Sequence, residues 1–104
     1  MPRLFVYGSL RQPDVQRATF GRTPRSRPDE LPGYELSTQQ SATQNRTRNA
    51  RSDSRVRGIV LQLSSAELSA ADRYERRAAY LRIEVQLASG TRAWIYVHEA
   101  TARR

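Results

Sequence analysis

The stretch Leu4-Phe5-Val6-Tyr7-Gly8-Ser9-Leu10 decides the fold, because it joins an apolar, β-branched and aromatic run to an abrupt turn signal. Its first four residues are typical of a buried strand. Gly8 then ends the strand, and a glycine there can leave consecutive backbone N–H groups exposed in a conformation that other residues resist. Such amides could hold an anion or a carbonyl oxygen. The alternative is that Gly8 only turns the chain.

Length and composition indicate one small domain over residues 1–104. A chain of 104 residues can bury one modest core and is too short for two. Its hydrophobic content of 38% and charged content of 27% are typical of globular proteins. No apolar run approaches the roughly 20 residues that cross a bilayer, and the N-terminus lacks a signal-peptide pattern. We therefore expect a cytoplasmic protein that contacts no membrane.

The chain has no cysteine and one histidine, His98. This composition excludes a disulfide framework, a thiol nucleophile, a cysteine-ligated zinc and a multi-histidine metal site. Any chemistry must therefore use carboxylates, hydroxyls or backbone groups. A Ser9 nucleophile with His98 as its base is disfavoured because no nucleophile-elbow pattern is present. We interpret His98 as a surface histidine.

The net charge is +8, and all 18 basic residues are arginine. A basic surface can attract phosphate groups and release counterions. However, the avoidance of lysine along the whole chain indicates a codon bias, and the aromatic residues do not interleave with the arginines as a base-stacking surface requires. Nucleic-acid binding is therefore the least favoured function class.

A short helix and a second strand are expected after the opening turn. Pro13 and Gly21 bracket a helix over residues 14–20. Its inward-facing side chains should be those of Val15, Ala18 and Phe20. Residues 22–29, which include two prolines, are interpreted as a loop. The strand should cover residues 31–39, entered through Pro32 and Gly33. Tyr34 and Leu36 should lie on one side of it.

Residues 41–55 are rich in Ser, Thr, Asn, Gln and Arg and have no hydrophobic periodicity. We interpret them as a long mobile surface loop. Five arginines between residues 46 and 57 stand against Asp53, which gives a local net charge of +4, five minus one. A solvated surface is the favoured interpretation. The alternative is a lid that recruits an acidic substrate, since long loops in compact domains are often functional.

Residues 56–63 alternate in hydrophobicity and predict a strand, in which Gly58 permits the close approach of another backbone. Ser64 stands three residues before Glu67, ahead of an apolar position, which is the pattern of a capping box at a helix N-terminus. We expect this helix to end near Tyr74 or Glu75.

Glu75 breaks two local rules at the end of this helix. At about 100° per residue it shares a stripe with Leu68 and Ala71, so its carboxylate lies on or beside the buried face. A negative charge near a helix C-terminus is also disfavoured by the helix dipole. Such violations cluster at functional sites. The alternative is a frayed helix end, in which Glu75 pairs with one of the arginines Arg76, Arg77 and Arg82.

Two alternating runs, over residues 80–87 and 92–98, close the chain and predict two strands with one aliphatic face each. These faces match across an antiparallel pair only if opposing residue numbers sum to an even total. That requires a three- or five-residue connection centred on Gly90, or a bulge. The expected pairs are Leu87 with Ala93, Val85 with Ile95, Glu84 with Tyr96 and Gln86 with Trp94. Residues 100–104 should form a loose tail.

Together these segments make the chain similar to the gamma-glutamylcyclotransferase-like family, also called the AIG2-like family. The resemblance is carried by LFVYGSLR (4–11), LPGY (31–34), GIV (58–60), EL (67–68), DRYE (72–75), YLR (80–82) and AWIYV (93–97). The YGSL element alone is a weak motif, but its order with DxYE, YxR and AWxYV is fairly specific. The resemblance covers nearly the whole chain except residues 41–55.

The resemblance implies an α+β fold, a small and mostly antiparallel β-barrel with short flanking helices. It places the substrate at the YGSL turn, formed by Tyr7, Gly8, Ser9 and Leu10, whose amides would hold a γ-glutamyl group. It assigns the general base to Glu75 and implies neither a metal nor an organic cofactor. The remaining expected pocket residues are Tyr80, Arg82 and Tyr96. For Tyr80 and Arg82 the alternative is that they only cap the barrel.

The implied reaction makes the chain a transferase-like enzyme that acts on a small γ-glutamyl substrate. The α-amine of the γ-glutamyl group attacks its own γ-carbonyl carbon, which gives 5-oxoproline and releases the attached amine or amino acid. The nucleophile is already tethered, so folding the substrate supplies much of the acceleration. A non-catalytic member that binds small ligands or a protein partner through the same pocket is the alternative.

Overall fold

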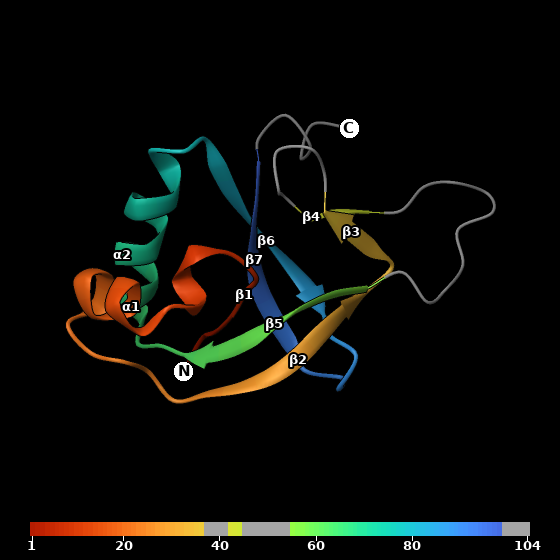
Figure 1. The fold of residues 1–104 in the computed structure, drawn as a ribbon, viewed down its shortest axis with the longest axis horizontal. Coiled ribbons are helices and arrows are strands. Elements are labelled where there is room, and N and C mark those ends of the chain that lie inside the picture. Colours follow the sequence, from red (N-terminus) through yellow and green to blue (C-terminus); the bar gives the residue numbers. More distant parts are fainter. Residues whose placement is uncertain (37–41, 45–54, 99–104) are drawn as a thin grey trace.

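The computed structural model describes residues 1–36, 42–44 and 55–98. In chain order the elements are β1 (Arg3–Val6), the 3-10 turn η1 (Ser9–Arg11), α1 (Pro13–Phe20), β2 (Ser26–Pro32), β3 (Tyr34–Leu36), β4 (Ala42–Gln44), β5 (Arg55–Gln62), α2 (Ser65–Arg76), β6 (Tyr80–Gln86) and β7 (Arg92–His98). Figure 1 shows the two helices together at one end of the sheet and the β3–β4 pair at the other. None of the helices in these ranges is long and apolar enough to span a membrane.

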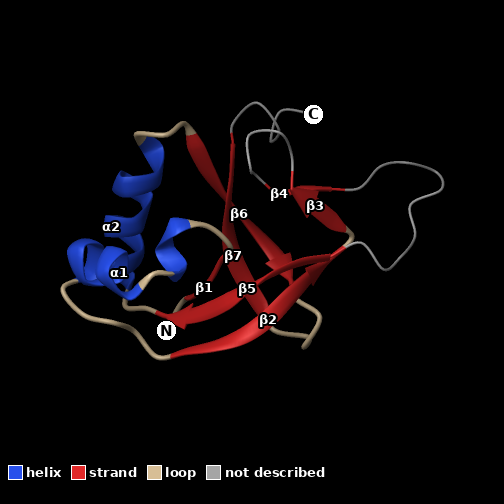
Figure 2. Ribbon diagram, viewed as in Figure 1, coloured by secondary structure: helices blue, strands red, loops and turns tan. Residues whose placement is uncertain are grey.

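The fold is α+β, with a mixed five-stranded sheet in the order β2-β5-β1-β7-β6 and a separate β3–β4 pair (Figure 2). β1 lies at the centre, antiparallel to β5 and parallel to β7. The outer pairs, β2 with β5 and β6 with β7, are antiparallel. In the described ranges no ladder joins the edge strands β2 and β6, so the expected closure into a barrel is not shown.

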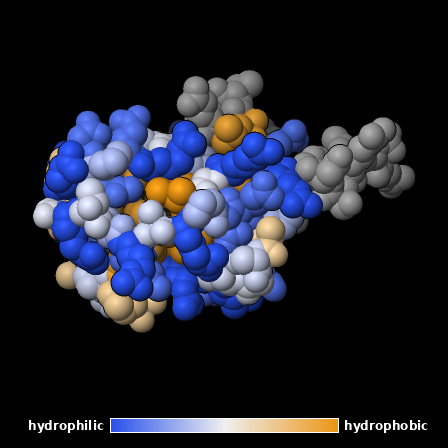
Figure 3. All heavy atoms as spheres, turned by 60° about the horizontal axis from the view of Figure 1, so that its bottom comes forward, coloured by the Kyte–Doolittle hydropathy of each residue, from blue (hydrophilic) through white to orange (hydrophobic). Residues whose placement is uncertain are grey.

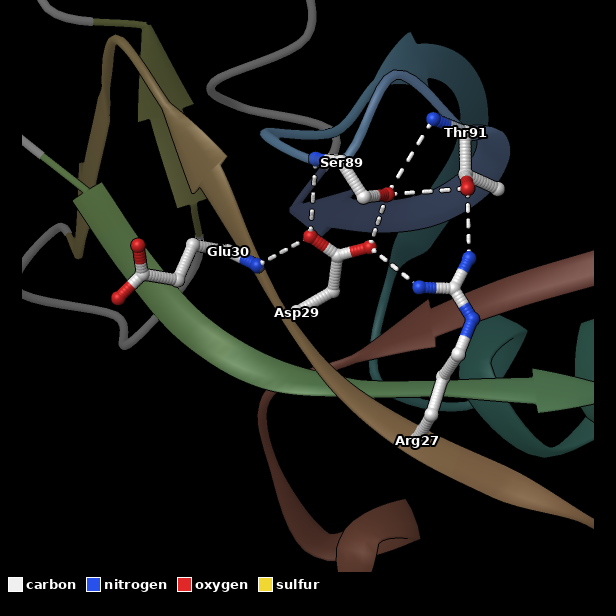
Figure 4. A network of polar contacts seen from close by, with 5 residues as sticks. All are labelled: Arg27, Asp29, Glu30, Ser89 and Thr91. Atoms are coloured by element: carbon white, nitrogen blue, oxygen red, sulfur yellow. Dashed lines mark hydrogen bonds and ion pairs between the residues drawn. The ribbon is translucent and has the colours of Figure 1, made fainter.

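The sheet nevertheless curls until the β6–β7 connection meets β2. The amide of Ala88 donates to the carbonyl of Glu30 over 2.8 Å. Beside it, the carboxylate of Asp29 accepts four hydrogen bonds, from the amides of Glu30 and Ser89, the Ser89 hydroxyl and the Arg27 guanidinium (Figure 4). Burial opposes the charge of Asp29, but these donors outweigh it and lower its pKa. Asp29 therefore fastens the turn to the opposite edge of the sheet.

Two hydrophobic clusters lie on opposite faces of the sheet, because successive side chains of β1 point to opposite sides. Phe5 belongs to the cluster enclosed by the curled strands. Leu4 and Val6 belong to the other cluster, which the helices cover with Leu68 and Ala71. Both faces of β1 are thus buried, and its end is held rigidly.

Gly58 of β5 confirms the expected close approach of two backbones. A Cβ atom at this position would lie 2.3 Å from the carbonyl oxygen of Val6 and 2.8 Å from Cζ of Phe5. Only glycine therefore allows β5 to pack this tightly against the end of β1.

Two expectations for the first half of the chain are wrong. The expected loop over residues 22–29 contains the start of β2, and the expected strand over residues 31–39 is divided between β2 and β3. β2 has no hydrophobic pattern that would mark it as a strand, because it lies at the edge of the sheet and its side chains are mostly exposed. An edge position also tolerates Pro28.

Most of the expected polar loop over residues 41–55 lies outside the described residues, as does the expected tail over residues 100–104. Within the loop, however, Ala42–Gln44 forms β4 and pairs with β3, so this part of the expectation is wrong. Of the five arginines assigned to this region, two belong to β5: Arg55 lies 2.8 Å and Arg57 3.5 Å from Glu30 on β2. These ion pairs join the neighbouring strands β5 and β2.

Both helices confirm their expected start signals, and α1 also confirms its stop signal, whereas α2 continues to Arg76, just beyond the expected end. α1 begins at Pro13 and ends at Phe20, and Gly21 caps it with a φ of 79°. α2 begins with a complete capping box between Ser64 and Glu67. One inward residue of α1 is wrong: Ala18 is exposed, and Gln16 is buried because its Nε2 donates to the carbonyl of Leu10 over 2.8 Å.

The β6–β7 pair confirms the even sum of opposing residue numbers, since Ile83 pairs with Ile95 and Val85 with Ala93. The specific pairs expected are wrong by two residues: Glu84 faces Trp94 and Arg82 faces Tyr96. Residues 87–91 form the five-residue connection between the strands.

Polar side chains cover most of the face drawn in Figure 3. Among the described residues, the large hydrophobic side chains that are clearly exposed are those of Met1, Leu36, Tyr74 and Leu81. Leu81 shares the expected aliphatic face of β6 with Ile83 and Val85. It is 41% exposed because β6 is an edge strand.

Candidate functional site

A cavity of about 340 Å³ opens where the end of β1 meets the C-terminal part of α2. Seven of the eight residues expected from the sequence line it: Tyr7, Gly8, Ser9, Leu10, Glu75, Tyr80 and Tyr96. The cavity is thus built from β1 and η1 near the start of the chain and from α2, β6 and β7 in its last third. Arg82 is the exception and does not line it.

Gly8 does not adopt the conformation expected from the sequence. Its φ is −123°, outside the left-handed region, and a Cβ at this position would have open space around it. The chain turns instead through η1, where the amide of Arg11 donates to the Gly8 carbonyl over 3.1 Å. Gly8 therefore leaves room in the cavity wall and is not required by backbone strain.

Amides without a backbone acceptor are nevertheless found at this turn in the described part of the chain. The first N–H groups of a helical turn have no partner within it. In η1 these are the amides of Ser9 and Leu10, and neither donates a backbone hydrogen bond within the described part of the chain. They follow a strand that is buried on both faces, so their position is fixed.

Glu75 reaches the cavity from the last turn of α2 and is partly buried. Within residues 1–36, 42–44 and 55–98 its carboxylate has no hydrogen-bond or ion-pair partner, which differs from the frayed, arginine-paired helix end considered from the sequence. Burial without a compensating donor disfavours the charged form. It raises the pKa of Glu75 to about 7.

The turn after α2 brings Tyr80 back beside Glu75. The amides of Ala78 and Ala79 donate to the carbonyls of Glu75 and Arg76, each over 3.0 Å. Ala79 has a φ of 61°, in the left-handed region that favours glycine. Burial and the negative charge of Glu75 raise the pKa of Tyr80, so its hydroxyl stays protonated. The ring of Tyr80 also meets that of His98 edge to face, with centroids 5.6 Å apart.

Tyr96 is buried between the cavity and α2 and is 5% exposed. Its backbone carbonyl accepts a hydrogen bond from the hydroxyl of Tyr7. Its own hydroxyl donates to Oδ1 of Asp72 over 2.7 Å. Burial and the neighbouring Asp72 raise the pKa of Tyr96 above its usual range, so this hydroxyl is neutral.

Arg82 lies behind the cavity wall. Its guanidinium stands over the ring of Trp94 at 4.5 Å and places Nε 3.6 Å from Oδ1 of Asp72. Arg82 borders a second hollow of about 350 Å³, which it shares with Tyr80 and Tyr96.

Sequence reasoning missed four lining residues: Phe5, Val6, Tyr74 and Ala78. Tyr74 is the most informative, because its hydroxyl lies 2.9 Å from Oγ of Ser9 and so joins α2 to η1 at the cavity. Its position inside the DxYE motif was the one available signal. The hydroxyl of Ser9 is therefore paired with Tyr74, which agrees with the expectation that Ser9 is not a nucleophile activated by His98.

Comparison with protein families gives one match. The family model described as "Gamma-glutamyl cyclotransferase, AIG2-like" matches residues 4–104 of this chain. No curated protein sequence matches the chain.

Three solved structures share the fold. The solution structure of At3g28950.1 from Arabidopsis thaliana matches with a TM-score of 0.77 and 25% identity, over 96% of this chain and 63% of that one. The solution structure of At5g39720.1, also from Arabidopsis thaliana, has a TM-score of 0.73 and 26% identity, over 93% of this chain and 68% of that one. The crystal structure of the uncharacterized protein PH0828 from Pyrococcus horikoshii has a TM-score of 0.69 and 19% identity, over 94% and 78%. The chain thus spans less than two thirds of the first of these.

Proposed function

The chain belongs to the AIG2-like gamma-glutamyl cyclotransferase family, and on this basis we propose that it cyclises a γ-glutamyl group to 5-oxoproline and releases the attached amine or amino acid. One observation carries the proposal: the carboxylate of Glu75, which is partly buried and has no partner among the described residues, lines the same cavity as the turn after β1. The first is suited to accept a proton, and the second to bind an oxygen atom.

Glu75 acts as the general base. A base works best when its pKa lies near the working pH, because it is then deprotonated and still basic. With a pKa of about 7, a large fraction of Glu75 is in the carboxylate form at neutral pH. It removes a proton from the α-ammonium group of the substrate, and the free amine nitrogen attacks the γ-carbonyl carbon.

The amides of Ser9 and Leu10 stabilise the oxyanion that forms on the γ-carbonyl oxygen, as fixed N–H groups do in acyl transfer. An alternative use of the same amides is to hold the α-carboxylate of the substrate. The new carbon–nitrogen bond closes a five-membered ring, and the bond to the leaving nitrogen breaks. Two protons pass in turn from the attacking to the leaving nitrogen with Glu75 as relay, so the carboxylate is regenerated.

The cavity walls favour the folded substrate. Tyr7, Tyr80 and Tyr96 are held by hydrogen bonds or ring contacts, and each borders the cavity. Because the nucleophile and the electrophile belong to one molecule, confining the γ-glutamyl group in a shape close to the ring supplies much of the rate.

The test is to incubate the protein with γ-glutamyl amino acids, γ-glutamyl amines and glutathione and to measure 5-oxoproline. Wild type should form it, and Glu75→Gln, which is nearly isosteric, should stay folded and lose about 10²- to 10⁴-fold in turnover. Glu84→Gln is the matched control, because Glu84 lies on β6 away from the cavity and pairs with Arg92. Full activity in Glu75→Gln would show that Glu75 is not the general base. Binding of these compounds without 5-oxoproline would favour a non-catalytic binding protein.

A further inference from the structure

Asp72 lies one helical turn before Glu75 on α2, but its carboxylate has a different environment. Oδ1 of Asp72 accepts a hydrogen bond from the hydroxyl of Tyr96 over 2.7 Å and lies 3.6 Å from Nε of Arg82. It borders the second hollow and not the cavity that contains Glu75. We propose that Asp72 is a positioning residue, which acts through Tyr96 and Arg82 to hold the cavity wall and to balance the charge around Glu75. This inference rests on the proposed role of Glu75.

Tyr96 connects Asp72 to the other side of the cavity through two hydrogen bonds. Its backbone carbonyl is bonded to Tyr7 at the end of β1, and its hydroxyl is bonded to Asp72 on α2. These bonds tie Tyr96 to the segment that leads into η1 and to the helix that carries the base. Tyr96 therefore fixes their separation. The hydroxyl of Tyr96 donates its hydrogen bond to Asp72 and not into the cavity, so Tyr96 contributes to the cavity as part of its wall.

Arg82 contributes the positive charge that Asp72 balances. The face of Trp94 lies 4.5 Å from its guanidinium carbon and restricts where the charge can go. Asp72 faces it from α2, and both side chains of this pair are less than a third exposed. With Asp72 charged, the two charges largely cancel at the distance of the cavity. Without that charge, Arg82 would act on Glu75 as an unbalanced cation.

Other charged or titratable groups lie in or near the cavity, and their balance must be included. Tyr7, Tyr74, Tyr80 and Tyr96 line the cavity with Glu75. Asp72, Arg76 and Arg82 border the second hollow, Arg77 follows the end of α2, and His98 contacts the ring of Tyr80. Removal of the Asp72 charge takes away an anion three residues from Glu75 and leaves the cations in place. Both effects favour the Glu75 carboxylate, so the pKa of Glu75 should fall.

Two variants separate the charge of Asp72 from its hydrogen bond. Asp72→Asn keeps an oxygen acceptor for Tyr96 and removes the charge. The acid limb of kcat/KM should move to lower pH by about half a unit to one unit, while kcat at the plateau stays within about threefold. Asp72→Ala removes the acceptor as well, so Tyr96 loosens and kcat should fall about tenfold with a smaller change in KM. Glu84→Gln should change neither quantity.

A second readout does not need turnover. The carboxyl carbon of Glu75 can be titrated by NMR in wild type and in Asp72→Asn, and the midpoint should fall by the same amount as the acid limb. If wild type forms no 5-oxoproline but the midpoint falls, the proposed function fails and the electrostatic role of Asp72 stands. The inference is overturned if Asp72→Asn keeps the wild-type midpoint and acid limb and Asp72→Ala keeps the wild-type kcat. A drop in melting temperature alone would not support it.

Discussion

The two ends of α2 place the same side chain, glutamate, in opposite environments. At the N-terminal end, Glu67 accepts bonds from the Ser64 amide at 2.8 Å and from Arg22 at 2.6 and 2.8 Å. The hydrogen bonds and charge of Arg22, with the Ser64 amide, lower the pKa of Glu67 to about 2. At the C-terminal end, Glu75 has no such donor in the described ranges, and burial raises its pKa to about 7.

The difference shows which end serves the fold and which end is available for chemistry. The N-terminal end satisfies each local rule: it has a capping box, a negative charge at the positive end of the helix dipole, and an ion pair. The C-terminal end and the turn after it break three rules. Among the described residues the Glu75 carboxylate has no partner, it lies at the negative end of the helix dipole, and Ala79 is left-handed. Such costs persist where a site requires them.

The largest expected contrast is in the pH dependence of turnover. If Glu75 is the base, kcat/KM should rise about 100-fold between pH 5 and pH 8, with a midpoint near 7, because only the carboxylate form reacts. Glu67→Gln should keep this midpoint, since Glu67 lies at the other end of the helix. Rates over this pH range for wild type and Glu67→Gln measure the contrast. A midpoint that moves with Glu67→Gln would break it.

The second contrast is in stability against pH. The folded state holds the Glu75 proton more tightly than the unfolded chain, where the pKa is 4.5, so the free energy of unfolding should fall as pH rises from 4.5 to about 7. With screening by solvent allowed for, the loss should be about 1–2 kcal/mol. Urea unfolding of wild type and Glu75→Gln between pH 5 and pH 8 measures it, and the variant should show no such fall.

Glu67 should give the opposite slope when the same urea unfolding is extended down to pH 2. Its lowered pKa stabilises the folded state fully above pH 4.5, and this contribution is lost as pH falls toward 2. Glu67→Gln should therefore remove a slope at acid pH and leave the one near neutrality. Identical pH profiles for Glu67→Gln and Glu75→Gln would contradict the comparison.

The cap itself gives a smaller effect. Ser64→Ala removes the hydroxyl that accepts the Glu67 amide at 3.1 Å, and it should lower the free energy of unfolding by about 1 kcal/mol. Turnover per folded molecule should stay at the wild-type value, because the cap is distant from the cavity. Ser65→Ala is the matched control, since Ser65 is the exposed neighbour and has no capping bond. Equal stability of the two variants would show that the cap does not contribute to the free energy of unfolding.

The smallest effect is expected at the other end of the helix. Ala79→Gly places glycine where φ is 61° and should raise the free energy of unfolding by about 0.5–1 kcal/mol. Thermal or urea unfolding measures the gain. Ala78→Gly, one residue earlier, should destabilise, because Ala78 does not have a positive φ. A loss of stability in Ala79→Gly would show that no strain is stored in this turn.

The sequence predicted the elements whose local signals agree with their final environment. The run from Leu4 was recognised as a buried strand, Ser64 and Glu67 as a cap, and Gly58 as a point of close approach, and the structure confirms all three. Glu75 was singled out because two rules conflict at one residue. These features depend on residue type and spacing, which the sequence contains.

The missed features depend on partners far along the chain. β2 has polar, exposed side chains and pairs with β5 about thirty residues later, so no local pattern marks it. Gln16 is buried only because it can reach the Leu10 carbonyl. The bond between Tyr96 and Asp72 joins residues 24 positions apart, which leaves no periodic signal. The β6–β7 register differs by two residues because both registers satisfy the same alternation.

The most direct test is to titrate the carboxyl carbons of Glu67 and Glu75 by NMR in one sample of the wild-type protein. The account predicts midpoints of about 2 for Glu67 and about 7 for Glu75. Midpoints near 4.5 for both would mean that the cavity does not desolvate Glu75, and its assignment as the base would be contradicted.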